Sequence, residues 1–264
     1  MPRYRLLLEY DGSGFVGWQR QANGRSVQAT LEEAIRIFSG EAAVVEGAGR
    51  TDAGVHATGQ VAHFDLARFH PPERVQAAIN ALVRPHPIAV LEVRVVDRSF
   101  HARLSAIERR YVYRILNRRA PPVLERGRVW HVVRPLDVVH MQEAARLLEG
   151  RHDFSSFRDA ECQAASPVKT LSRLVVQRRG CVVEIRAAAR SFLHHQVRNM
   201  VGTLVLVGDG RRPIAWVREV LEARDRRAAG PTAPACGLYL EAVRYPDEPL
   251  SAAGACTSVA SDNP

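Results

Sequence analysis

The stretch GRTDAGVHATGQVAHFD, residues 49–65, places one carboxylate between two glycines at the start of a predicted strand. Residues 55–65 are expected to be extended, and Gly49 and Gly54 let the backbone come close to a ligand. In an extended segment Arg50 and Asp52 point to the same side, and a neighbouring guanidinium keeps a carboxylate ionised. Asp52 is therefore a candidate nucleophile or base. The alternative is a turn that holds a structural Arg–Asp ion pair, since such pairs are common on protein surfaces.

The residues around this stretch predict a β-α-β-α-β order in the first half of the chain. Strands are expected over 4–10 and 88–96, and a glycine-rich loop over 11–25. One helix is capped by Ser26, and a second begins at Pro71-Pro72-Glu73. Apolar residues recur at helical spacing in both: Val27, Leu31, Ile35 and Phe38 in the first, then Val75, Ile79 and Leu82, which the second helix is expected to bury.

The second half of the chain is also predicted to combine strands and helices in an α+β arrangement. Strands are predicted over 105–117 and 237–245, with a hairpin over 171–188 that turns at Arg179-Gly180. Helices are predicted from the Asp137 cap to a Gly150 stop, over 192–207, and from Pro213 to Arg224. We expect an α+β fold of two ferredoxin-like halves, residues 1–104 and 105–246, with mixed or antiparallel sheets flanked by helices around a central cleft. Residues 247–264 are Pro-, Ala- and Ser-rich, so a disordered tail is expected.

Composition narrows the class of protein. The chain has 264 residues, of which 46% are hydrophobic, and 37 Lys+Arg against 28 Asp+Glu give a net charge of +9. Lys169 is the only lysine, so the positive charge is almost all arginine, which suits a phosphate-rich partner but also follows from GC-rich codon usage. No apolar run is long enough for a membrane span, and the short apolar core of residues 1–10 leads us to expect no secretory signal. The cysteines, Cys162, Cys181, Cys236 and Cys256, lack metal or redox spacing, which favours reduced thiols in a cytoplasmic protein.

Two segments combine basic and aromatic residues. On the strand over 107–115, Arg109, Tyr111 and Tyr113 alternate onto one face, as in surfaces that stack single-stranded bases, although both tyrosines could equally belong to the core. In the loop over 11–25, Trp18 stands near Arg20 and Arg25. This tryptophan could contact RNA or fill the core beneath the loop.

A third segment, residues 191–202, carries adjacent histidines and an arginine. His194 and His195 would not share a helix face, and no third ligand stands nearby at metal spacing, so a zinc site is not expected here. Arg198 falls beside an apolar helix face, where burying a guanidinium is costly unless a carboxylate meets it. Asp52 is a candidate partner for Arg198.

Seven blocks along the chain resemble, in order, the tRNA pseudouridine synthase A family. They run from about residue 4 to 246, and the blocks at 49–56 and 192–202 are the most specific. The blocks are Tyr10-Asp11-Gly12 with Gly17-Trp18-Gln19-Arg20-Gln21 and Ser26-Val27-Gln28; Gly49 to His56; Phe100-His101-Ala102-Arg103; Arg110-Tyr111-Val112-Tyr113; Asp153-Phe154-Ser155-Ser156-Phe157; Phe192 to Gly202; and Gly237-Leu238-Tyr239-Leu240.

The resemblance implies the pseudouridine synthase fold, a homodimer, and an isomerase that needs no cofactor or metal. It implies conversion of uridine to pseudouridine at nucleotides 38, 39 and 40 of the tRNA anticodon stem-loop. The family's catalytic aspartate falls on Asp52, its base-flipping arginine on Arg50 and its base-contacting tyrosine on Tyr111. The arginine that pairs with the aspartate falls on Arg198, and the apolar pocket residue on Leu238. Further tRNA contacts are expected from Trp18, Arg20, Arg25, Arg109 and Arg110.

Two other classes of function compete with this one. A non-catalytic RNA-binding protein or RNA chaperone on the same fold would keep the basic face and tolerate loss of Asp52. A carboxylate-dependent hydrolase fits the net charge of +9 poorly and lacks a second placed acid. Within the isomerase hypothesis, it stays open whether Asp52 adds to the sugar, adds to the base or removes a proton.

Overall fold

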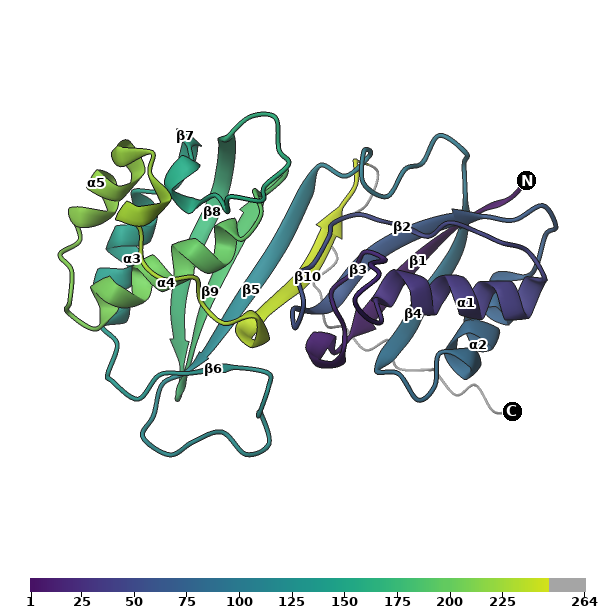
Figure 1. Cartoon of the computed structure of the whole chain (residues 1–264), viewed down its shortest axis with the longest axis horizontal. Coiled ribbons are helices and arrows are strands. Elements are labelled where there is room, and N and C mark those ends of the chain that lie inside the picture. The colour runs from purple at the N-terminus through teal and green to yellow at the C-terminus, as the bar shows by residue number, and fades with distance from the viewer. Residues whose placement is uncertain (247–264) are drawn as a thin grey trace, which may run out of the picture.

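A single mixed sheet runs through both halves of the molecule (Figure 1). The computed structural model describes residues 1–246, so the predicted tail lies outside the described residues. The strand order is β4-β1-β3-β10-β5-β9-β8-β7, and short strands β2 and β6 pair with β3 and β5. The strands are β1 (Arg3–Tyr10), β2 (Glu46–Gly47), β3 (His56–Asp65), β4 (Ile88–Val96), β5 (Glu108–Leu116), β6 (Trp130–His131), β7 (Gly150–Asp153), β8 (Val168–Arg179), β9 (Val182–Ala189) and β10 (Leu238–Arg244).

Helices pack on this sheet in two groups, one in each half (Figure 1). The helices are α1 (Val27–Ser39), α2 (Pro72–Leu82), α3 (Val138–Arg146), α4 (Gln196–Gly208) and α5 (Trp216–Ala223). Helices α1 and α2 pack on each other and α2 on β4, while α3 packs on α4 and β8. No helix within residues 1–246 is long and apolar enough to cross a membrane.

The two halves meet at β10. This last strand is antiparallel to β5 but parallel to β3, where Tyr239 pairs with His56 and Leu240 with Ala57. The approach is close, because a Cβ atom at Gly59 would lie 2.2 Å from the carbonyl oxygen of Glu241. A glycine is therefore required in β3 for β10 to join it. The expected mixed and antiparallel sheets are thus one continuous sheet, and β10 joins the two halves.

Local patterns account for most elements. Ser26 Oγ accepts a hydrogen bond from Ala29 N at 3.2 Å, which confirms the predicted cap of α1. Asp137 Oδ1 accepts from Val139 N and His140 N at 2.9 and 3.0 Å, which confirms the cap of α3. Alternate residues of β1 are buried in the core, as expected for a strand with one core face: Tyr4, Leu6, Leu8 and Tyr10.

Four predicted details are wrong. The helix predicted over 192–207 begins only at Gln196, because His195 has a φ of 60°, outside the helical region. The helix predicted from Pro213 begins at Trp216. Gly150 begins β7 rather than ending α3, whose last residue is Arg146. Leu82, at the end of α2, is 37% exposed rather than buried.

Gly202 is expected to be the glycine in α4 that least tolerates a side chain. A Cβ atom there would lie 1.7 Å from the carbonyl oxygen of Pro231, so the segment over 231–233 would have to move. We expect Gly202→Ala to lower the free energy of unfolding by about 3 kcal/mol. For a chain of this size that lowers Tm by roughly 6–12 °C.

The control is Gly14→Ala, because nothing lies within 4 Å of a Cβ atom at Gly14. Thermal unfolding followed by circular dichroism checks both variants. Equal Tm values for Gly202→Ala and the unsubstituted chain would show that the packing of 231–233 on α4 is not tight.

Candidate active site

Asp52 lies in a tight turn before β3, and the loop over 11–25 packs against its backbone. Val55 N donates to Asp52 O at 3.1 Å, and Trp18 N donates to Thr51 O at 3.0 Å. Gly17 has a φ of +112°, and a Cβ atom there would lie 2.6 Å from Thr51 O. The loop can therefore reach the Asp52 turn only through a residue without a side chain.

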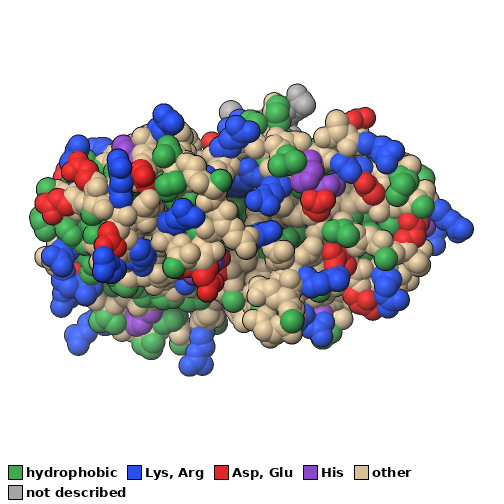
Figure 2. Space-filling view, turned by 45° about the horizontal axis from the view of Figure 1, so that its top comes forward, with side chains coloured by type: hydrophobic (Ala, Val, Ile, Leu, Met, Phe, Trp, Pro, Cys, Tyr) green, Lys and Arg blue, Asp and Glu red, His purple; other side chains and the backbone are tan. Residues whose placement is uncertain are grey.

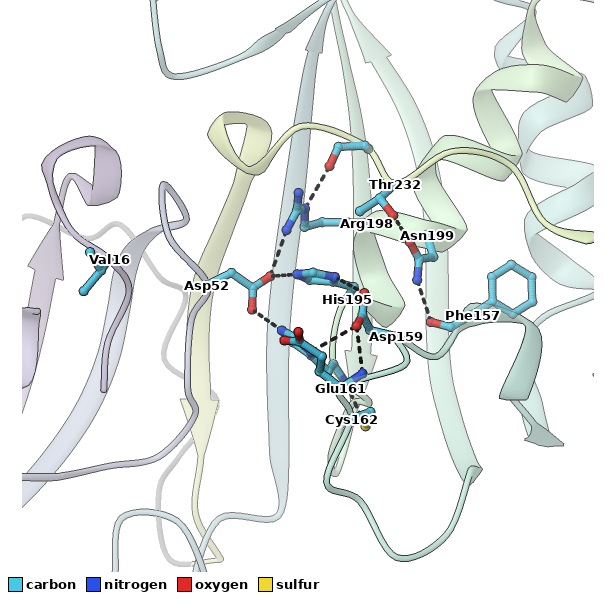
Figure 3. A network of polar contacts seen from close by, with 12 residues as sticks. Val16, Asp52, Phe157, Asp159, Glu161, Cys162, His195, Arg198, Asn199 and Thr232 are labelled. Atoms are coloured by element: carbon cyan, nitrogen blue, oxygen red, sulfur yellow. Dashed lines mark hydrogen bonds and ion pairs between the residues drawn. The ribbon is translucent and has the colours of Figure 1, made fainter. Parts of the chain in front are cut away.

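The Asp52 carboxylate meets Arg198, which lies in the first turn of α4 (Figure 3). Arg198 Nη1 donates to Asp52 Oδ2 at 3.0 Å, and Arg198 Nε donates to Ala233 O at 2.8 Å. Their side chains are 14% and 23% exposed. The prediction that Asp52 meets this arginine beside its apolar helix face is confirmed.

Two histidines join the same carboxylate. His194 Nε2 lies 3.3 Å from Asp52 Oδ1, and His195 Nε2 lies 3.2 Å from Asp52 Oδ2. His195 has a positive φ and is the last residue before α4. The rings of His194 and His195 lie with their centroids 4.0 Å apart. The expectation that no third ligand stands near the two histidines is therefore wrong. Both histidines precede the helix, and the nearby third group is Asp52, whose ligand atom lies within 4.8 Å of theirs.

Asp159 completes the network from the far side of the histidines (Figure 3). Its Oδ2 lies 2.7 Å from His195 Nδ1, and its Oδ1 lies 3.8 Å from His194 Nδ1. Asn199 of α4 holds the backbone just before Asp159, because its Nδ2 donates to Phe157 O at 2.9 Å. Sequence reasoning missed Asp159, since neither its spacing nor its neighbours mark it as a site residue.

The charges of this network stabilise ionised Asp52. Burial raises the pKa of Asp52, but hydrogen bonds and charges from His195 and Arg198 outweigh burial and bring the pKa below its ordinary value. The hydrogen bond to Asp52 raises the pKa of His195 against the effect of burial, and Asp159 adds to that rise. Asp52 is therefore a carboxylate at neutral pH, able to act as a nucleophile or a base.

Arg50 is not a charge partner of Asp52. Its guanidinium is exposed, and its described hydrogen bond runs from Nη1 to Gln163 Oε1 at 3.4 Å. The ion partners of Asp52 among the described residues are His194, His195 and Arg198. The predicted Arg50–Asp52 pairing is therefore wrong in both its functional and its structural form, and Arg50 has an exposed side chain whose described hydrogen bond is long.

Tyr111 and Leu238 are both buried. Tyr111 on β5 packs edge-to-face on Phe192, with ring centroids 5.2 Å apart. Burial raises the pKa of Tyr111, and the negative charge of Asp52 raises it further, so the phenol is neutral. Leu238 is the first residue of β10 and pairs with Tyr113 on β5.

Of the residues expected to contact tRNA, some are buried in the core and the others lie at the surface. Trp18 is 3% exposed and fills the core beside Gly47, where a Cβ atom would lie 2.5 Å from its ring, so the core alternative holds. Arg109 is 8% exposed and donates to carbonyl oxygens of Ala48 and Arg190 at 2.8 and 2.6 Å. Burial thus removes Trp18 and Arg109 from any surface that RNA can reach. The other three arginines are at least partly exposed. Arg20 pairs with Glu32, Arg25 with His86, and Arg110 with Glu108.

Comparison with known proteins identifies the family of this chain. Residues 7–104 and 144–246 match the sequence profile of a family described as tRNA pseudouridine synthase. A protein of Rhodospirillum rubrum named tRNA pseudouridine synthase A is 60% identical over 255 residues, which cover 97% of this chain and 92% of that one. A protein of the same name from Rhodospirillum centenum is 62% identical over 245 residues, covering 93% and 100%. The chain belongs to the tRNA pseudouridine synthase family, and it is an isomerase.

Proposed function

We propose that the chain converts uridine to pseudouridine at nucleotides 38, 39 and 40 of the tRNA anticodon stem-loop, with Asp52 as the reacting carboxylate. The observation that carries the proposal is the state of Asp52: a carboxylate that Arg198 and His195 keep ionised, yet 23% exposed in a turn between the two halves. A protein that only binds RNA gains nothing from a negative charge facing a polyanion.

The substrate uridine is expected to leave its helix before it reacts. A base inside a stem is out of reach of Asp52, and extruding it costs a few kcal/mol. Arg50 stands two residues before Asp52, is exposed, and within residues 1–246 is held by one long hydrogen bond to Gln163. Its planar, cationic side chain is suited to occupy the vacated stack and to contact phosphate.

In the proposed reaction, the uracil base changes its point of attachment to the sugar while it stays in the pocket. The bond from C1′ to N1 breaks and a bond from C1′ to C5 forms, while C5 loses a proton and N1 gains one. Asp52 assists by adding to the substrate or by taking a proton from it. The detached base must not escape or meet water, so Tyr111 and Leu238 are proposed to line the apolar side of the pocket.

The charge of the chain supports a tRNA partner. The net charge is +9, and Figure 2 shows Lys and Arg side chains spread over one face, with several near the middle of the view. Such a surface attracts phosphate through counterion release. The proposal includes a homodimer, in which one subunit positions the tRNA while the other reacts with it.

A single-turnover assay tests the proposed function. Protein in excess is mixed with unmodified tRNA that carries uridine at 38, 39 and 40, and pseudouridine is mapped by carbodiimide-dependent primer-extension stops. Stops at these positions are expected. A protein that binds this tRNA and yields no stop would instead be an RNA-binding protein or act on another RNA.

Arg50→Ala is expected to slow the reaction without weakening the fold. The side chain is exposed and makes one long hydrogen bond to the part of the chain that the structure describes, so Tm should change by no more than about 1–2 °C. The single-turnover rate should fall about 10–100-fold, because a cation that holds the flipped state is lost.

The matched control is Arg36→Ala, which removes an exposed arginine of α1 that pairs with Glu33. Rates and Tm values of the two variants are measured side by side. If both variants react at the rate of the unsubstituted chain, Arg50 has no part in base extrusion.

A further inference from the structure

Two imidazoles and one carboxylate converge at metal-ligand spacing around Asp52. The Nε2 atoms of His194 and His195 lie 3.3 and 3.2 Å from the two oxygens of Asp52, and the three ligand atoms lie within 4.8 Å of one another. Bonds of about 2.0–2.1 Å in a tetrahedral zinc site place ligand atoms about 3.3–3.4 Å apart. One ion can therefore bind all three groups with small shifts of the side chains.

The far side of each imidazole faces a second carboxylate. His195 Nδ1 lies 2.7 Å from Asp159 Oδ2, and His194 Nδ1 lies 3.8 Å from Asp159 Oδ1. A carboxylate accepts but does not donate, so Nδ1 of His195 carries the proton. Metal-binding histidines are held in this way, with one ring nitrogen donating to a carboxylate and the other turned to the metal. An ion bound here displaces the Nε2 proton that otherwise joins His195 to Asp52.

A second cluster shows why spacing alone is not enough. Glu46, His63 and His101 also bring their ligand atoms within 4.8 Å of one another. However, Nδ1 of His63 accepts from Ala102 N at 3.3 Å, and Nδ1 of His101 accepts from Arg103 N at 3.2 Å. An imidazole whose Nδ1 accepts carries its proton on Nε2, which then has no lone pair for a metal. This cluster therefore serves as a control of matched composition.

We propose that Asp52, His194 and His195 form a binding site for one transition-metal ion of the zinc class, and that the bound ion blocks the enzyme. Two nitrogens and one oxygen suit zinc, cobalt or nickel rather than magnesium, which prefers oxygen ligands only. Arg198 donates to Oδ2 of Asp52, which leaves Oδ1 for the ion. The blocking effect rests on the proposed function, because it follows from occupying the reacting carboxylate.

Metal binding is tested without tRNA. Protein dialysed against a chelator is titrated with Zn²⁺ in competition with a chromophoric chelator, and separately with Co²⁺ while the visible spectrum is recorded. One equivalent of each ion is expected, with the intense visible absorption of tetrahedral Co²⁺. His194→Ala and His195→Ala should each weaken Zn²⁺ binding at least about 100-fold, and His101→Ala should leave it unchanged.

A further variant and a stability measurement guard against misfolding. His195→Asn keeps a donor toward Asp159 but offers no imidazole nitrogen to the ion, and Tm is recorded for every variant. Absence of Zn²⁺ binding to the unsubstituted chain overturns the site. So does affinity equal to that of the unsubstituted chain in folded His195→Ala and His195→Asn, or loss of affinity in folded His101→Ala, which would place the ion at the second cluster.

The blocking effect is tested with the single-turnover assay. One equivalent of Zn²⁺ should stop product formation, and excess chelator should restore it. Product formed at an unchanged rate with Zn²⁺ bound through the histidines overturns the block. Zinc binding by the histidines in a protein without activity on tRNA leaves the site standing and counts against the proposed function instead.

Discussion

Asp52→Asn is expected to lower the single-turnover rate of pseudouridine formation by more than about 10⁴-fold. The amide has nearly the shape of the carboxylate, but it can neither add to the substrate nor take a proton from it. Binding of tRNA should stay unchanged or become tighter, because the variant removes a negative charge that faces a polyanion. Rates are measured by carbodiimide mapping, and affinity by filter binding at one stated salt concentration.

The control for this variant is Asp65→Asn, at the end of β3. Asp65 is also a carboxylate paired with an arginine, since Arg3 Nε and Nη2 donate to it at 2.8 Å each, but it lies outside the network around Asp52. Asp65→Asn should react at the rate of the unsubstituted chain. Product formed by Asp52→Asn at that same rate would remove Asp52 from the reaction and favour another group in the site.

Arg198→Met is expected to have the second-largest effect, a loss of about 10²–10³-fold in the single-turnover rate. Methionine has a similar reach but supplies neither the charge nor the hydrogen bond to Asp52 Oδ2. Without that donor, one of the two groups that lower the pKa of Asp52 is lost, so this pKa rises, and the carboxylate is no longer held in its orientation. Affinity for tRNA should change far less than the rate, since this guanidinium is 14% exposed.

Arg198→Lys separates charge from geometry. A lysine restores the charge but cannot donate along two fixed directions to Asp52 and to Ala233 O, so its rate should fall between those of Arg198→Met and the unsubstituted chain. The comparison uses rates at saturating protein, with Tm recorded. An Arg198→Met variant that reacts as fast as the unsubstituted chain would show that the ion pair serves only the fold.

Much of this protein was determined by the sequence itself. The Leu- and Tyr-rich run over 4–10 predicted β1, the Ser26 cap predicted the start of α1, and the run over 88–96 predicted β4 with its observed bounds. These features depend on neighbours within a few positions, so a short window of residues contains the needed information. The meeting of Arg198 with Asp52 was also predictable, because a guanidinium beside an apolar helix face requires a carboxylate wherever the chain supplies one. The ordered blocks indicated the family.

Only the tertiary structure decided how the site is built. Residues far apart in the chain meet there: Asp52 before β3, Asp159 after β7, and His195 before α4. The positive φ of His195 is a backbone conformation that no pattern in 191–202 announces, and it breaks the helix that the apolar spacing predicted. Burial likewise turned Arg109 and Trp18 from expected RNA contacts into core residues. Contacts and burial of this kind depend on how whole elements pack, which local periodicity does not record.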